Sequence, residues 1–538
     1  MAGLAKAFGS GAMTNSVPDL EEADCILVTG SNTTEAHPLI ASRVFKAKEK
    51  GAKLIVIEPR NIHLAGYADL YLGQRPGTDV AWINGMMNVI IEQGWQDNDF
   101  IQNRTEGFEA LREKVKEYPL EKVEQITGIP KDDLFRAAEM YAKAGSAAIL
   151  YAMGITQHTS GTDNVLSLCN LAMLTGNLGK RGSGVNPLRG QNNVQGACDL
   201  GGLPNVFTSY QSVTDNELRK KFEEAWGVKL PAEAGITLME MMNAAAEGNV
   251  KGMFILGENP LLSDPDIGHV REALEKLEFL VVQDIFLTET AQLADVVLPG
   301  TSWAEKDGTF TGTDRRVQRI RKVIEPIGES TPDWQIICEL AKEMGSTGFD
   351  YQSPEEVFEE IARLTPIYQG ISYPRIVSNG LQWPCRSEDD PGTEFMHKDT
   401  FSKGLGTFTP VDFREPAELP DEQYPLTLTT GRSSFHFHTG TMTRNSPTLV
   451  DEINEGFMEI NPADAEQLGI ADNEVIKVTS RRGEIEIMAR LTDRVGKGVI
   501  FIPFHFAESA ANVLTNAALD PVAKIPEYKV CAVKVEKT

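Results

Sequence analysis

Residues 24–58, DCILVTGSNTTEAHPLIASRVFKAKEKGAKLIVIE, contain the pattern that decides the fold. An apolar run at 25–30 is followed by a polar turn and then by the segment 39–51, which has apolar residues at helical spacing. The run KLIVIEP at 53–59 is a second apolar segment of strand length, and it carries the acid Glu58 near its end. Because strand-length apolar runs flank a helical pattern, this stretch predicts a strand–helix–strand unit.

The same unit recurs in the second half of the chain. A strand and turn at 252–260, a helix at 266–277 and a strand at 279–286 repeat the order of the first unit. Four landmarks keep one register, at offsets of 226 or 227 residues: Gly30 and Gly257, Asn32 and Asn259, Glu58 and Asp284, and Asp69 and Asp295. Four matches in one register indicate two homologous α/β halves, and a two-copy array is too short for a solenoid.

Each copy has the pattern of a nucleotide-binding crevice. A glycine turn at the carboxyl end of a strand lets backbone N–H groups approach a phosphate, and the acid after the next strand can accept from a ribose hydroxyl or a base N–H. The alternative is two structural α/β layers without a ligand. The G-x-G-x-x-G fingerprint is absent, which argues against a NAD-dependent dehydrogenase.

The domain organisation follows from these patterns. We expect an α/β protein with two dinucleotide-binding α/β domains, related by a pseudo-twofold axis, and a C-terminal double-psi-like β-barrel. The predicted boundaries are 1–190 for the first α/β domain, 191–346 for the second, 347–423 for a connector and 424–538 for the barrel. The barrel is expected from short β-rich runs such as PLTLTTG and GVIFIPF.

Composition excludes several classes of protein. The 538 residues include 77 Asp and Glu against 51 Lys and Arg, a net charge of -26, which argues against a nucleic-acid binder. No apolar run is long enough to insert in a bilayer. The 6 cysteines are scattered, so no local Cys-x-x-Cys metal motif is present. A reducing cytoplasm is the expected setting.

The loop NPLRGQNNVQGACD at 186–199 is rich in planar amides and contains one arginine, Arg189. Such groups suit bidentate recognition of a planar anion or heterocycle. The glycines at 176, 179, 182 and 184 precede it, and we expect them to let the backbone pack tightly against a ligand.

Several long motifs resemble a known family. NLAMLTGNLGKRGSGVN, ETAQLADVVLP and EKDGTFTGTDRRVQ resemble molybdopterin-dependent oxidoreductases of the dimethyl sulfoxide reductase type. YAMGITQHTSGTDNV, RGQNNVQGACD, TTGRSSFHFHTGTMTR and DPVAKIPEYK are similar to the catalytic (alpha) subunit of formate dehydrogenase in particular. The resemblance implies an oxidoreductase with one molybdenum or tungsten held by two molybdopterin guanine dinucleotides, one dinucleotide in each α/β half.

The resemblance also implies roles for individual residues. Gly30, Asn32, Glu58, Arg60, Gln74 and Asp79 would line one dinucleotide, with Met153 and Gln157 near its pterin. Gly257, Asn259, Gln283, Asp284 and Asp333 would line the other dinucleotide. Thr430, Gly431, Arg432, His438, Thr443, His505, Asn512, Tyr528 and Lys529 would close over the pterins from the barrel. The histidines of this last group, together with His436, are expected to donate hydrogen bonds to a pterin. His37, His63, His269 and His397 are expected to have no special role.

The resemblance implies a substrate as well. Arg189 matches the arginine that faces formate in the family, and Gln191 lies beside it. A guanidinium fork would hold the carboxylate and orient its C–H bond for reversible oxidation to CO2. The alternative for Arg189 is a clamp on a pterin phosphate. Alternatives for the whole chain are another molybdopterin oxidoreductase, such as a nitrate reductase, and a non-catalytic relative.

Two devices of the family are expected before Met1. Family members carry a four-cysteine [4Fe–4S] domain, and then a Cys or selenocysteine that ligates the metal, ahead of a stretch resembling residues 2–16. We expect an in-frame UGA codon upstream and a second α/β domain that is incomplete within these residues. The electron acceptor stays open among ferredoxin, a diaphorase, a hydrogenase and a deazaflavin, and so does export by a signal upstream.

Overall fold

The computed structural model describes all residues, 1–538, and they divide into two compact units. The first unit comprises residues 1–190, 262–268 and 395–538. The second unit comprises residues 191–261 and 269–394. The chain therefore passes from one unit to the other between Gly190 and Gln191, within the amide-rich loop.

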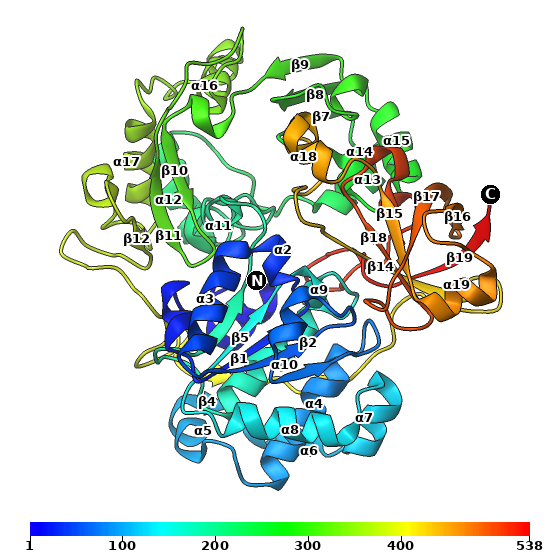
Figure 1. The fold of residues 1–538 in the computed structure, drawn as a ribbon. Coiled ribbons are helices and arrows are strands. Elements are labelled where there is room, and N and C mark those ends of the chain that lie inside the picture. Colours follow the sequence, from blue (N-terminus) through cyan, green and yellow to red (C-terminus); the bar gives the residue numbers. More distant parts are fainter. The chain divides into compact units, whose positions relative to one another are not determined.

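A five-stranded parallel sheet forms the centre of the first unit, in the order β3-β2-β1-β5-β6. Its strands are β1 (Cys25–Thr29), β2 (Lys53–Ile57), β3 (Leu70–Leu72), β5 (Ala147–Tyr151) and β6 (Gly184–Pro187). Helices cover both faces (Figure 1). Helix α3 (Pro38–Glu49) packs on one face, and α4 (Asp79–Glu92), α8 (Lys131–Ala142) and α10 (Gly161–Leu174) belong to the core of the other face.

Side-chain alternation along β1 explains this two-layered packing. Ile26 and Val28 belong to the core that contains α3, whereas Cys25 and Leu27 belong to the core on the opposite side. All five residues of β1 are buried, as expected for a parallel strand covered on both faces. The predicted strand–helix–strand unit is confirmed, with the short helix α2 (Thr33–Ala36) added after the glycine turn.

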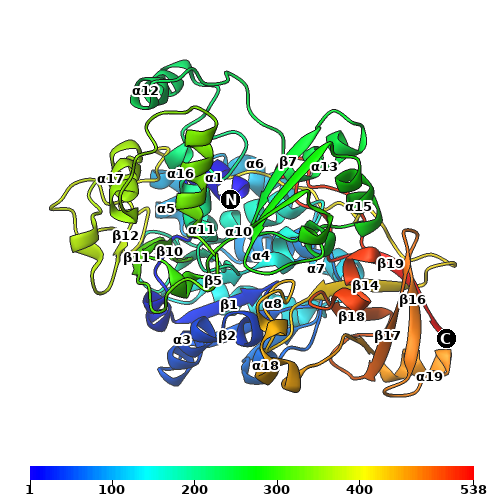
Figure 2. The same cartoon turned by 90° about the horizontal axis from the view of Figure 1, so that it is seen from above.

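The C-terminal part of the first unit is a closed barrel of six strands in the order β14-β18-β15-β17-β16-β19. The strands are β14 (Leu426–Gly431), β15 (Phe457–Ile460), β16 (Val475–Thr479), β17 (Glu484–Leu491), β18 (Val499–Pro503) and β19 (Cys531–Lys537). Figure 2 shows β16, β17 and β18 near the helix α19 (Pro462–Leu468). The barrel is confirmed, although the sequence patterns did not predict β15 or β19.

The second unit contains the repeated copy of the α/β pattern. Strands β7 (Gly252–Leu256), β8 (Phe279–Asp284) and β9 (Val296–Pro299) form a parallel sheet in that order. Asp295 accepts a hydrogen bond from the amide of Leu280 at 2.7 Å. Asp69 accepts the equivalent bond from the amide of Leu54 at 2.9 Å in the first unit. This shared bond, at the 226-residue offset, confirms the repeat in atomic detail.

One face of the β7-β8-β9 sheet is apolar and open. Phe254 and Leu256 of β7 are 41% and 46% exposed, and Phe279 of β8 is 51% exposed. The opposite face is covered by α13 (Leu238–Ala246) and α15 (Ile267–Glu275). Parallel sheets ordinarily bury both faces, so this sheet differs from the one in the first unit. The incompleteness of the second domain stays a prediction.

The remaining elements are short. In the first unit they are α1 (Ala2–Phe8), α5 (Asn98–Arg104), β4 (Thr105–Glu106), α6 (Phe108–Val115), α7 (Leu120–Thr127), α9 (Met153–Thr156), β13 (Gly406–Thr407) and α18 (Pro447–Glu452), and α14 (Pro260–Ser263) begins outside it. In the second unit they are α11 (Val194–Asp199), α12 (Asn216–Trp226), β10 (Gly308–Thr311), β11 (Arg316–Ile320), α16 (Asp333–Glu343), α17 (Pro354–Leu364) and β12 (Leu381–Gln382). None of the helices combines the length and the apolarity needed to cross a membrane.

Candidate functional site

The predicted residues of the first α/β domain all follow the carboxyl ends of strands. They occupy the segments after each strand of the sheet: Gly30 and Asn32 after β1, Glu58 and Arg60 after β2, Gln74 and Asp79 after β3, Met153 and Gln157 after β5, and Arg189 after β6. Because the strands are parallel, these segments share one edge of the sheet. Ligands of open α/β sheets bind at this edge.

The crevice lies where the strand order changes direction, between β1 and β5. Gly30 has a φ of 56°, and its carbonyl accepts a hydrogen bond from the amide of Gly154 at 2.9 Å. A Cβ on either glycine would lie 2.5 Å from the backbone of the opposite turn. Only glycines allow the turns after β1 and β5 to meet in this way.

Two carboxyl groups are buried beside this crevice. Burial raises the pKa of Glu58 to about 7, and the charge of Asp79 adds to the shift, whereas Lys529 and Arg60 oppose it. Burial also raises the pKa of Asp79 to about 6, against the hydrogen bond from Trp82. Such displaced values are typical of groups arranged around a ligand.

His158 is buried between the carboxyl groups of Asp79 and Glu527. Its Nε2 lies 2.9 Å from the carbonyl of Gly154 and 4.0 Å from Asp79, and its Nδ1 lies 4.0 Å from Glu527. Burial lowers the pKa of His158 to about 4, so the ring is neutral at neutral pH. The unpartnered Nδ1 leaves one hydrogen-bonding position open.

The barrel contributes loops from one of its ends. Strands β14 and β18 are parallel, so Arg432 and His505 follow strand ends that lie side by side. The amide of Ser433 donates to His505 Nε2 at 2.9 Å. Lys529 Nζ donates to the carbonyl of Thr430 at 2.7 Å, and burial lowers the pKa of Lys529 to about 8. These contacts fix the end of β14 and the loop that follows it.

Arg432 brings a positive charge to the loop after β6. A Cβ on Gly190 would lie 2.5 Å from the Arg432 guanidinium, which places this group beside the residue after Arg189. Arg432 lies 5.1 Å from the Phe437 ring and forms no ion pair with a carboxylate. Its charge and burial lower the pKa of His438 to about 4, burial being the larger cause. A half-buried guanidinium without a carboxylate partner suits an anion.

His37 contacts the same loop. Its Nε2 lies 3.1 Å from the carbonyl of Arg189, and its Nδ1 has no partner. Burial, reinforced by Arg432, lowers the pKa of His37 to about 4. The guanidinium of Arg189 donates to the carbonyl of Gly11 at 3.3 Å. His37 and Gly11 therefore hold the backbone and the side chain of Arg189.

The second unit has its own polar cluster after β8 and β9. Gln283 Nε2 donates to Asp333 at 2.7 Å, and Lys306 forms a short ion pair with the same carboxylate. Lys306 also donates to the carbonyl of Thr301 at 3.1 Å. Gln283 Oε1 and Thr301 Oγ1 are buried without a partner. Burial raises the pKa of Asp284, whose carboxylate accepts from the amide of Ile285 at 2.6 Å.

Comparison with known protein families identifies the chain. The family described as Molybdopterin oxidoreductase matches residues 3–343, and the family described as Molydopterin dinucleotide binding domain matches residues 426–532. The chain belongs to the molybdopterin oxidoreductases. It is therefore an oxidoreductase, as the motifs predicted, and the dinucleotide-binding match coincides with the barrel.

Individual members of this molybdopterin oxidoreductase family are similar over the whole chain. An F420-dependent formate dehydrogenase subunit alpha of Methanocaldococcus jannaschii is 56% identical, over 99% of this chain and 80% of the relative. The F420-dependent formate dehydrogenase 1 subunit alpha of Methanococcus maripaludis is 54% identical, over 99% of this chain and 79% of the relative. Formate dehydrogenase H of Escherichia coli is 44% identical, over 100% of this chain and 76% of the relative.

A solved structure shows the same fold. Acetylene hydratase from Pelobacter acetylenicus superimposes with a TM-score of 0.78 at 24% identity, over 100% of this chain and 80% of that chain. The mixed α/β architecture with a closed barrel is therefore confirmed.

The residues present fit the molybdopterin dinucleotide that the family implies. In the first unit, Asn32 Nδ2, Glu58 Oε2 and Gln74 Oε1 are buried without hydrogen-bond partners at the carboxyl edge of the sheet. Buried polar atoms are ordinarily paired, so unpaired ones on segments at one edge of a sheet indicate a polar ligand. Arg432 supplies a charge for a phosphate, and Gln283 Oε1 with Thr301 Oγ1 repeats the pattern in the second unit.

Other predicted cofactor residues hold the protein itself. Both ring nitrogens of His505 are used, because Nδ1 lies 2.5 Å from the carbonyl of His438. These bonds are within the protein, and the expected donation from His505 to a pterin stays a prediction. Four more predicted side chains bond to other parts of the protein: Arg60 to Glu459, Thr443 to His436 and the amide of Phe437, Asn512 to the carbonyls of Leu262 and Ser263, and Tyr528 to the carbonyl of Ser263.

Both ring nitrogens of His436 also contact other parts of the protein. Its Nε2 lies 2.7 Å from the carbonyl of Ile453 and its Nδ1 lies 3.2 Å from Thr443, and the donation to a pterin stays a prediction. In the second unit, Asn259 bonds to Glu289 and Thr290. The turn residue Gly257 has a φ of 64°, like Gly30.

Side chains of the amide-rich segment bond to the protein itself, which the sequence patterns did not predict. Gln195 Nε2 donates to Asp199 at 2.7 Å, and Asn193 accepts from the amide of Thr311 at 2.8 Å. Asp199 also accepts from Tyr368 at 2.8 Å. These bonds therefore hold α11 together and attach it to β10 and to Tyr368. Gln191 is half-buried and begins the second unit, one residue from the end of the first.

The glycines before this loop pack closely against other parts of the chain. A Cβ at 176, 179, 182 or 184 would clash with Asp97, the carbonyl of His397, the carbonyl of Glu22 or the side chains of Thr14 and Asn15. Their close approaches are to the chain itself, and the expected ligand beside them stays a prediction.

Sequence reasoning missed three residues of the site. The sequence patterns predict no special role for His37, and they single out neither His158 nor Gly154. A signal existed for each, because His37 lies in the loop after β1, while Gly154 and His158 flank the predicted residues Met153 and Gln157.

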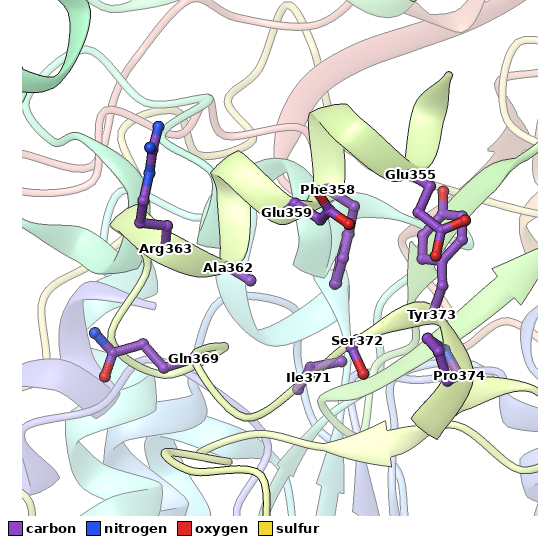
Figure 3. A pocket seen from close by; sticks show the side chains of 10 residues that line it. All are labelled: Glu355, Phe358, Glu359, Ala362, Arg363, Gln369, Ile371, Ser372, Tyr373 and Pro374. Atoms are coloured by element: carbon purple, nitrogen blue, oxygen red, sulfur yellow. The ribbon is translucent and has the colours of Figure 1, made fainter. Parts of the chain in front are cut away.

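A separate cavity of about 440 Å³ lies in the second unit (Figure 3). Helix α17 and the segment 369–374 line it, with Phe358, Tyr373 and Arg363 among its residues. None of the predicted site residues lines this cavity, so it is distinct from both polar clusters.

Proposed function

We propose that the chain is the catalytic alpha subunit of a formate dehydrogenase that interconverts formate and CO2. The observation that carries this proposal is the identity of 44–56% to formate dehydrogenases over 99–100% of the chain. The reaction releases CO2, one proton and two electrons from each formate. Two molybdopterin guanine dinucleotides with molybdenum or tungsten would supply the two-electron redox chemistry when bound.

The first unit offers residues for each part of this task. Asn32, Glu58 and Gln74 would hold one dinucleotide through their unpartnered polar atoms. Arg189, held by Gly11 and His37, would bind and orient the formate carboxylate. Charge-assisted bonds from a guanidinium to a carboxylate are directional, so this arginine would fix the direction of the C–H bond.

The second unit would hold the other dinucleotide by its own cluster. Gln283 and Thr301 carry the unpartnered oxygens, and Asp333 orients Gln283 through the bond at 2.7 Å. Lys306 forms an ion pair with the same carboxylate, which accepts the hydrogen bond from Gln283.

The electron acceptor is part of the proposal. The two archaeal relatives described above, at 54–56% identity, are F420-dependent, whereas formate dehydrogenase H is 44% identical. We therefore favour a deazaflavin acceptor reached through a partner subunit, over ferredoxin, a diaphorase or a hydrogenase. An iron–sulfur cluster for electron exit and a cytoplasmic location belong to the same proposal.

Metal analysis and turnover of the native protein, isolated without oxygen, test the proposal. We expect molybdenum or tungsten and guanine nucleotide in the protein, and two electrons passed to a viologen dye for each formate consumed. Reduction of F420 in the presence of the partner subunit would support the favoured acceptor. Metal-free protein that is inactive with formate would refute the function, and turnover of nitrate without formate oxidation would favour the nitrate reductase alternative.

A further inference from the structure

A buried network joins the barrel to the edge of the first sheet. Arg60 Nε and Nη2 each donate to a different oxygen of Glu459, both at 2.6 Å. The two side chains are 6% and 5% exposed, and the guanidinium lies 3.9 Å from the centre of the Phe501 ring. Glu459 on β15 pairs with Phe501 on β18, so the barrel fixes both groups that hold Arg60.

Arg494 extends this network to a second turn. It lies between β17 and β18, and its Nη1 is 3.3 Å from Glu459, whereas its Nη2 is 3.1 Å from Glu35. Its carbonyl accepts a bond from the amide of Asn61 at 2.7 Å. One carboxylate and one arginine of the barrel therefore bind groups from two separate segments of the α/β domain.

Those two segments are the ones that carry the unpartnered polar atoms. Glu35 belongs to α2, which begins directly after Asn32, and Arg60 follows Glu58 by two residues. Asn32 Nδ2 and Glu58 Oε2 lack partners, whereas Glu35 and Arg60 are both bonded to the barrel. In each of the two turns, one residue is bonded to the barrel and another has an unpartnered polar atom that a ligand can use.

We propose that Glu459 and Arg494 are positioning residues, which set the turns after β1 and β2 for the first dinucleotide. The proposal rests on the proposed function, because it assumes that a dinucleotide binds there. Neither residue touches the ligand in this proposal. The charges of Glu35, Arg60, Glu459 and Arg494 balance, so the network is neutral as a whole, and loss of the Glu459 charge leaves the buried Arg60 guanidinium without its carboxylate partner.

Hydrogen exchange of the purified full chain, followed by mass spectrometry, tests the positioning directly. Glu459→Gln removes the charge that both arginines share, so we expect at least tenfold faster exchange in residues 31–37 and 58–62. Arg494→Gln cuts the bond to Glu35 but leaves the Arg60 fork, so we expect faster exchange only in residues 31–37. This split distinguishes positioning from general loss of stability, and Arg494→Gln also tests the proposal if Glu459→Gln does not fold.

Glu418→Gln is the matched control. Glu418 also accepts from two arginines, Arg481 and Arg482, and its side chain is 11% exposed. It contacts neither turn, so we expect no change in the exchange of residues 31–37 or 58–62. Equal exchange of both turns in Glu459→Gln and the unmodified chain would overturn the proposal, as would the same increase in Glu418→Gln.

Bound nucleotide, released by acid hydrolysis, separates this proposal from the proposed function. We expect the unmodified native protein to contain guanine nucleotide, and Glu459→Gln to contain at least fivefold less. Absence of nucleotide from the unmodified protein would refute the proposed function. Full nucleotide content in Glu459→Gln, beside a loaded unmodified protein, would overturn the positioning role alone.

Discussion

The amide of Gly154 donates a hydrogen bond to the carbonyl of Gly30 at 2.9 Å, which joins the turns after β5 and β1. These two strands are neighbours in the sheet, although more than 100 residues separate them in the chain. The contact brings the two turns together at the place where the strand order of the sheet reverses. Because both turns lead to predicted ligand-binding residues, the contact determines how those residues face the crevice.

Alanine at Gly154 should destabilise the first unit. Its Cβ would lie 2.5 Å from Gly30 Cα, so the two turns must separate. We expect the free energy of unfolding to fall by about 1–3 kcal/mol, the usual range for overpacking. Urea unfolding measures this change. Gly66→Ala is the control, because its Cβ would meet nothing within 4 Å. An equal effect of both substitutions would contradict the steric argument.

Stability should depend on the ionisation of Glu58. Burial raises the pKa of Glu58 to about 7, above its unfolded value, so the contribution of Glu58 is present at low pH and is lost as the pH rises toward and through 7. Between pH 5 and 7.5 we expect the free energy of unfolding of the unmodified chain to fall by about 2 kcal/mol more than that of Glu58→Gln. Urea unfolding at both pH values checks this, and parallel curves for the two proteins would contradict it.

His158 should give the opposite dependence on pH. Burial lowers the pKa of His158 to about 4, below its unfolded value, so its contribution is complete above about pH 6.5 and is lost as the pH falls through 4. As the pH falls from 7 to 4.5, we expect the free energy of unfolding of His158→Gln to fall by about 2 kcal/mol less than that of the unmodified chain. His63→Gln, at an exposed position, is the control. If the two variants lose stability alike, His158 is not the responsible group.

Arg432 should stabilise the loaded protein and destabilise the empty one. Its guanidinium is half-buried and has no carboxylate partner, so its charge is compensated only when an anion binds. We expect Arg432→Gln to raise the free energy of unfolding of cofactor-free protein by about 1 kcal/mol and to reduce bound nucleotide severalfold. Lower stability of the empty variant would show that Arg432 is paired within the protein.

Arg189 should control the use of formate. Lysine keeps the positive charge but lacks the planar guanidinium fork. The substitution therefore removes one charge-assisted hydrogen bond to the carboxylate. We therefore expect Arg189→Lys to lower kcat/KM for formate by about 10–100-fold, with bound metal and nucleotide unchanged. Steady-state kinetics with a viologen dye measures this, and Arg136→Lys on the exposed side of α8 is the control. Unchanged kinetics with formate and less nucleotide would favour the phosphate-clamp alternative.

The repeat was predictable because it depends on local sequence patterns. Residues 25–58 and 252–284 each carry two apolar strand segments around a helix, and these periodicities depend on neighbours in the chain. The hydrogen bonds of Asp69 and Asp295 to Leu54 and Leu280 follow from that register. Strands β15 and β19 were missed, since Phe457–Ile460 is a run of only four residues and β19 closes the barrel by pairing with distant strands.

The sequence alone was sufficient for the strand–helix–strand units, the β-rich C-terminal region and the motifs that place the chain among the molybdopterin oxidoreductases. It also located the glycine turns and the acids after the strands. Whether a polar side chain there faces a ligand or the protein was decided only by the tertiary structure. Arg60 and Glu58 lie two residues apart, yet Arg60 binds Glu459, nearly 400 residues away, whereas Glu58 Oε2 has no partner. The partner of a buried charge is set by packing between distant segments, and local patterns carry no information about it.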